Sequence, residues 1–89
     1  LRADEDIKQI IEALLFSSSD PISLEKMKDV VSTSYPIRTK EIQKCIDQLS
    51  SEYRTQKRAF QIDEIAGGFV LRTLPHMRPF VEKLLSDRR

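Results

Sequence analysis

The stretch from Phe60 to Thr73 is the part of this 89-residue chain in which apolar residues alternate with a period of two. The chain's two glycines, Gly67 and Gly68, lie side by side at its centre. A Gly-Gly pair between two alternating segments is typical of a β-hairpin, because type I′ and II′ turns need residues with positive φ. We therefore predict a hairpin over about residues 60–73, with the two glycines as its turn.

The register of this hairpin decides which side chains face a core. With the turn at the glycines, Ile65 lies opposite Val70 and Asp63 lies opposite Arg72, which places opposite charges across the strands. One face then carries mainly apolar side chains: Phe60, Ile62, Ala66, Phe69 and Leu71, with Glu64 and Thr73 as polar members. Ile65 and Val70 point to the other face. Because an isolated two-stranded hairpin is marginal in water, the rest of the chain must supply its packing surface.

Four amphipathic segments can supply that surface. Their spacing predicts helices over about residues 4–17, 23–32, 39–54 and 77–86. The four apolar stripes are Ile7, Ile10, Ile11, Leu14 and Leu15; Leu24, Met27, Val30 and Val31; Ile42, Cys45, Ile46, Leu49 and Tyr53; and Met77, Phe80, Val81, Leu84 and Leu85. The first three stripes are interpreted as core.

Local signals mark the helix ends. Ser23 and Thr39 are typical N-caps of the second and third helices. Pro79 predicts a loose or kinked first turn in the last helix, because proline removes a backbone hydrogen bond. The element order α-α-α-β-β plus a C-terminal helix predicts a mainly α fold with a β-hairpin (α+β), a winged helix in one domain over residues 1–89.

Composition limits the classes of protein that this chain can belong to. It carries 15 basic and 14 acidic residues, a net charge of +1, which lacks the strong basic stripe of an autonomous nucleic-acid-binding domain. No apolar run approaches the ~20 residues of a membrane-spanning helix. A single cysteine excludes an internal disulfide and fits a cytoplasmic protein. Because the chain starts at Leu1 and stops abruptly after Arg88 and Arg89, we expect it to be part of a longer protein.

The residues that catalysis needs are scarce. His76 is the single histidine and Cys45 the single cysteine, and they fall in different predicted elements. Cys45 occupies a core position, where an inert buried thiol is expected. No metal-ligand spacing is present, and the two glycines lack the lysine of a phosphate-binding loop. We predict no catalytic, metal-binding or cofactor-binding residue, and hence no enzyme.

Two binding functions stay open. A winged helix can place its third helix in the DNA major groove, where Gln43 and Gln48 could read bases. Three acids on that outward face, Glu41, Asp47 and Glu52, would oppose the phosphates.

The other function is protein interaction. Its candidate residues are Ile65 and Val70 on the outer face of the hairpin and Phe80 and Leu84 on the last helix. The alternatives for the hairpin pair are packing against the last helix or scattered surface exposure.

Several segments resemble a known family. IEALLFSS at residues 11–18, followed by DPISL at 20–24, resembles the opening segment of the segregation and condensation protein B family. AGGFVLRT at 66–73 is similar to the wing of that family, and PFVEKLL at 79–85 is similar to the helix that follows it. The serines at 17–19 and the Ser-Thr-Ser turn at 32–34 depart from the family pattern. Together the segments cover nearly the whole chain in the right order.

The resemblance implies the N-terminal winged-helix domain of a bacterial protein with a second such domain. It implies a non-enzymatic scaffold that forms a homodimer and binds the kleisin subunit, segregation and condensation protein A. The kleisin bridges the heads of the structural-maintenance-of-chromosomes (SMC) ATPase, so contact with the ATPase is indirect. The implied role is chromosome condensation and segregation in the cytoplasm, at the nucleoid, with no cofactor, membrane or specific nucleic acid. We expect the hairpin and the last helix to support self-association; the alternative is a DNA-binding, transcription-regulator-like domain.

Overall fold

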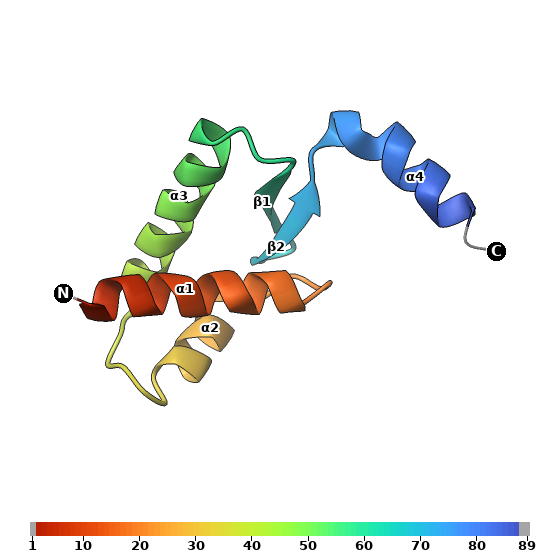
Figure 1. The fold of residues 1–89 in the computed structure, drawn as a ribbon. Helices are drawn as coiled ribbons and strands as arrows, with labels where there is room; N and C mark the ends of the chain where they lie inside the picture. Colours follow the sequence, from red (N-terminus) through yellow and green to blue (C-terminus); the bar gives the residue numbers. More distant parts are fainter. Residues whose placement is uncertain (1, 88–89) are drawn as a thin grey trace.

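The computed structural model describes residues 2–87, which form four α-helices and one hairpin within that range (Figure 1). The elements in order are α1 (Arg2–Ser17), α2 (Leu24–Val31), α3 (Thr39–Thr55), β1 (Phe60–Ile65), β2 (Gly68–Thr73), the 3₁₀ turn η1 (Pro75–Met77) and α4 (Arg78–Ser86). This is the predicted α-α-α-β-β order with an additional helix, and the α+β winged-helix prediction is confirmed.

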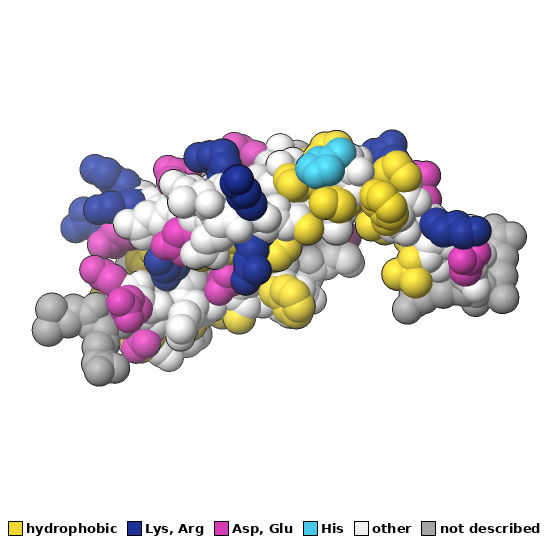
Figure 2. All heavy atoms as spheres, turned by 45° about the horizontal axis from the view of Figure 1, so that its top comes forward, with side chains coloured by type: hydrophobic (Ala, Val, Ile, Leu, Met, Phe, Trp, Pro, Cys, Tyr) yellow, Lys and Arg dark blue, Asp and Glu magenta, His cyan; other side chains and the backbone are white. Residues whose placement is uncertain are grey.

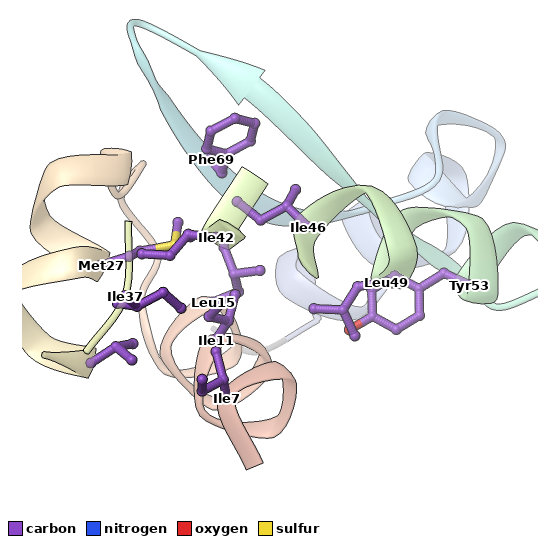
Figure 3. Close-up of a cluster of buried hydrophobic side chains, with 11 residues drawn as sticks. Ile7, Ile11, Leu15, Met27, Ile37, Ile42, Ile46, Leu49, Tyr53 and Phe69 are labelled. Atoms are coloured by element: carbon purple, nitrogen blue, oxygen red, sulfur yellow. The ribbon is translucent and has the colours of Figure 1, made fainter. Parts of the chain in front are cut away.

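The core lies between α1, α2, α3 and the hairpin (Figure 3). Ile11, Met27 and Ile42 are completely buried, one from each of the first three helices. Phe69 reaches the same cluster from β2. The stripes predicted for the first three helices thus form the core, with one exception: Val30 is exposed, because α2 covers the core mainly with Met27 and Val31.

The hairpin turn lies one residue earlier than predicted. Ile65 pairs with Gly68, and the two turn residues between them, Ala66 and Gly67, both have positive φ, at 53° and 76°. Asp63 therefore pairs with Val70, and the predicted register is wrong by two residues. A shift of two leaves every side chain within β1 and β2 on its predicted face, because strand residues alternate with a period of two. Ala66, predicted on the apolar face, is instead an exposed turn residue.

The second glycine serves a close backbone approach instead of the turn. A Cβ at Gly68 would lie 3.0 Å from both the backbone nitrogen and the carbonyl carbon of Ile22. Ile22 and Phe69 exchange two backbone hydrogen bonds, of 2.9 and 2.8 Å. The segment before α2 thus pairs with β2, and β2 is flanked on both sides.

The sequence predicted N-caps at Ser23 and Thr39 and an irregular first turn at Pro79, and two of these three predictions are confirmed. The Ser23 hydroxyl accepts a hydrogen bond of 3.0 Å from the Lys26 amide, as expected of an N-cap. Thr39 is the first residue of α3, and the N-cap is Arg38, whose amide donates to the Glu41 carboxylate at 2.9 Å. The irregular start predicted from Pro79 is the 3₁₀ turn η1 before α4.

Candidate interaction surface

Helix α4 projects away from the body formed by the other elements (Figure 1). Its principal contacts within the chain are with η1, and the molecule is elongated, with extents of 45 × 26 × 20 Å. The apolar stripe of α4 consequently lacks the cover that the other stripes have. Phe80 is 73% exposed and Leu84 is 62% exposed, and Leu85 beside them is also exposed. Both predicted residues on this helix therefore lie on an accessible apolar surface.

The two candidate interface residues on the hairpin, Val70 and Ile65, are less exposed than those on α4. Val70 is only 5% exposed, so its predicted position on an open outer face is wrong. Across the strands Val70 lies opposite Asp63 of β1, and next to it along β2 Phe69 pairs with Ile22, so the segment before α2 lies against the other edge of β2. Ile65, next to the turn, is half-buried. A role of these two residues in an interface stays a prediction.

Phe16 is an exposed aromatic residue that the sequence analysis missed. It lies near the end of α1 and is 83% exposed. With Phe60 and Leu71 of the hairpin it lines a depression of about 280 Å³. The signal was present in the sequence, because Phe16 is a large apolar residue that follows the stripe of α1 without belonging to it.

Tyr53 anchors the hairpin to the helices. Its hydroxyl donates a 2.6 Å hydrogen bond to the Glu12 carboxylate on α1. Its ring meets the Phe60 ring edge to face, with centroids 4.9 Å apart. Burial and the hydrogen bond to Glu12 both raise the pKa of Tyr53 well above its usual range. The hairpin is thereby held at the C-terminal end of α3.

Two side chains on the face of α3 that could enter DNA, Gln43 and Glu52, have partners within the chain. The Gln43 side-chain amide donates to the Asp47 carboxylate at 3.0 Å. Glu52 forms an ion pair with Lys8 of α1, and the hydrogen bond from that ammonium to Glu52 raises the pKa of Lys8. Gln43, which was predicted to read bases, is thus hydrogen-bonded to a carboxylate that would repel the DNA phosphates. This arrangement disfavours the DNA-binding alternative.

The reactive side chains lie apart. Cys45 is half-buried against the core, less buried than predicted, and this burial raises the pKa of its thiol. His76 is exposed on η1. Among the described residues, no three His, Cys, Asp or Glu side chains are grouped so that they could hold a metal ion. Within residues 2–87, no helix has the length and apolar character needed to cross a membrane.

Relatives of known name match nearly the whole chain. Residues 9–89 match the family of segregation and condensation complex subunit ScpB. Segregation and condensation protein B of Alkaliphilus oremlandii is 32% identical over 85 residues, which cover 96% of this chain and 44% of that protein. The protein of the same name from Syntrophotalea carbinolica is 35% identical over 83 residues, 93% of this chain and 40% of that protein. This chain thus spans less than half the length of these relatives.

Solved structures agree with the sequence comparison. A crystal structure described as a dimer of the ScpB N-terminal domain complexed with an ScpA peptide superposes with a TM-score of 0.78 at 31% identity, covering 90% of this chain and 95% of that chain. A conserved hypothetical protein from Chlorobium tepidum gives a TM-score of 0.78 at 32% identity, covering 92% of this chain and 49% of that chain. On this agreement in sequence, helix order and wing, the chain belongs to the segregation and condensation complex subunit ScpB family.

Proposed function

We propose that this chain is a scaffold domain, without catalytic activity, of a bacterial SMC–kleisin complex. It forms a homodimer and binds the kleisin subunit ScpA, and through the kleisin it acts with the SMC ATPase in chromosome condensation and segregation. Its place is the cytoplasm, at the nucleoid. The observation that carries the proposal is the uncovered apolar stripe of α4, in a family whose N-terminal domain has been crystallised as a dimer with an ScpA peptide.

We also propose that the chain is one domain, the N-terminal part of a longer two-domain protein. Support comes from the lengths of its relatives, since it covers 44% of the Alkaliphilus protein but 95% of the crystallised N-terminal domain.

Self-association through α4 follows from the burial pattern. Contiguous exposed apolar patches are uncommon on soluble monomers and mark interaction sites. Phe80 and Leu84 lie one turn apart on α4, so they form a single ridge that a second copy can cover. Ile65 lies beside the hairpin turn, at the end of the hairpin opposite to α4, so any contribution from it would be a separate contact with the partner.

Purification of the full-length protein with and without its ScpA tests this function. A dimer that co-purifies with ScpA is the expected result. Substitution of Phe80 and Leu84 by aspartate should yield monomers, whereas the matched change of the exposed Val30 to aspartate on α2 should not. A wild-type protein that is monomeric at high micromolar concentration and fails to retain ScpA would contradict the proposal.

A further inference from the structure

A groove with a volume of about 500 Å³ lies where the C-terminal end of α3 meets β1 and η1. Its apolar lining comes from these elements and their connections: Tyr53, Ala59, Phe60, Ile62, Leu74 and Met77. Figure 2 shows apolar side chains around the chain's single histidine, His76, and further apolar side chains on α4. The self-association proposed for Phe80 and Leu84 does not use this groove.

Three exposed cations are part of the groove's lining. Arg54 lies in the last turn of α3, and Lys57 and Arg58 follow in the connection to β1. Within residues 2–87, none of the three lies within salt-bridge distance of a carboxylate. Asp63 is the one carboxylate of the described lining, and it already faces Arg72 at 3.9 Å. The groove therefore has an excess of positive charge beside an apolar surface.

The backbone holds these cations in place. The Arg58 amide donates to the Tyr53 carbonyl at 2.9 Å, and the Lys57 amide donates to the Arg54 carbonyl at 3.2 Å. Lys57 has a φ of 55°, so the end of α3 is a Schellman motif. Because the backbone that carries the three side chains is already ordered, a ligand pays less conformational entropy when it binds.

The edge of β1 also borders the groove. Within the described residues, β1 pairs with β2 alone, whereas the other side of β2 is taken by Ile22. Five consecutive residues, from Ala59 to Asp63, line the groove. A strand edge without a partner can accept an extended peptide through main-chain hydrogen bonds, while alternate side chains enter neighbouring pockets.

The chemistry of the groove favours an acidic peptide over other occupants. The α4 helix of a second copy has no excess acid to offer, because Arg78 pairs with Glu82 and Lys83 with Asp87. Nucleic acid would find a chain with a net charge of only +1 and would gain little from the aliphatic part of the lining.

We propose that this groove binds an extended, acidic segment of the kleisin subunit. Its apolar side chains would lie on the lining between Tyr53 and Met77, and its carboxylates would face Arg54, Lys57 and Arg58. The identity of the partner rests on the function proposed above, whereas the chemistry of the bound segment follows from the groove.

Overlapping fluorescent peptides that cover the ScpA of the same genome test this proposal by anisotropy with the full-length protein. We expect one acidic, apolar-containing peptide to bind, more weakly as salt rises. The variant Arg54→Glu/Arg58→Glu should bind it at least about tenfold more weakly, because two rim charges are reversed. The control Lys26→Glu/Lys40→Glu makes the same change in net charge on α2 and at the start of α3, and should bind normally.

Further measurements distinguish the possible outcomes. Thermal melting followed by circular dichroism must show that the Arg54→Glu/Arg58→Glu variant is folded. A version of the bound peptide with its acidic residues changed to the corresponding amides should bind the wild type and this variant with equal affinity. If the original peptide binds the wild type and this variant with equal affinity, the peptide binds elsewhere on the protein. The assignment of the groove is then wrong, whereas binding of the kleisin to the protein is not contradicted. If intact ScpA does not bind the wild-type protein, the proposed function itself fails. Displacement of the peptide by random-sequence duplex DNA at physiological salt would overturn the peptide assignment in favour of a nucleic-acid surface.

Discussion

Substitution of Gly68 by alanine tests the close approach between β2 and the segment before α2. The new Cβ would lie 3.0 Å from two backbone atoms of Ile22 and from the Cβ of Pro21. Ordinary contacts between carbon atoms are about 3.5–4.0 Å, so the Ile22 segment must move outward. Backbone atoms cannot rotate away as a flexible side chain can, and the pairing of Ile22 with Phe69 has to open.

The magnitude follows from what that movement breaks. The two hydrogen bonds between Ile22 and Phe69 each contribute about 1 kcal/mol net. Overpacking of a filled site costs about 1–3 kcal/mol. Together these give an expected loss of about 3–5 kcal/mol in the free energy of unfolding, or a fall in Tm of at least about 12 °C for a domain of this size.

Urea denaturation of the 89-residue chain measures this loss, with Gly67→Ala as the matched control. A Cβ at Gly67 meets nothing within 4 Å, so this variant bears only the strain of a φ of 76°, about 1 kcal/mol. The variant at Gly68 should therefore be the less stable of the two. An unchanged stability of Gly68→Ala would contradict the close approach of Ile22 to Gly68, and a larger loss at Gly67 than at Gly68 would contradict the predicted order of the two costs.

Three further predictions follow from the same structure. Ala66→Gly should raise stability by up to about 1 kcal/mol in thermal melts, since it relieves a positive φ of 53°; a loss of stability would place Ala66 within a strand. Tyr53→Phe should cost about 1 kcal/mol at neutral pH by removing the hydrogen bond to Glu12, whereas Leu49→Ala in the core should cost about 2–5 kcal/mol. Because the pKa of Tyr53 is raised in the folded protein, the unfolded chain loses this proton first, so wild-type stability should fall as pH rises above the ordinary value of 10.0; a denaturation series in which Tyr53→Phe declines just as steeply would contradict this.

The sequence pattern predicted the elements well because apolar periodicity is a direct consequence of burial. The stripes of the first three helices are also the stripes that meet Phe69 in the core. The hairpin register could not be predicted in the same way. A slip of two residues preserves the alternation of faces, so the pattern of Phe60, Ile62 and Leu71 is compatible with both registers. Only the approach of Ile22 to Gly68 distinguishes them, and that contact joins segments distant in the sequence.

The candidate surface was predictable in part. The apolar spacing of α4 gave Phe80 and Leu84, but an amphipathic pattern is the same for a helix that packs on its own domain and for one that projects from it. The burial of Val70 was not predicted, because strand alternation carries no information on contacts between distant segments such as the pairing of Ile22 with the adjacent Phe69. The groove beside Arg54 and Arg58 was missed because a basic connection after a helix has no periodicity to mark it; only the folded chain places β1 and η1 against it.

Sedimentation equilibrium of the full-length protein, alone and with its ScpA, tests the central claim most directly. We predict the mass of a homodimer for the protein alone and, with ScpA, a larger species that retains two copies of this chain. The Phe80→Asp/Leu84→Asp variant should sediment as a monomer with unchanged helix content, because both side chains are largely exposed within the chain. A wild-type monomer that forms no complex with ScpA, or a variant that remains dimeric, would contradict the account.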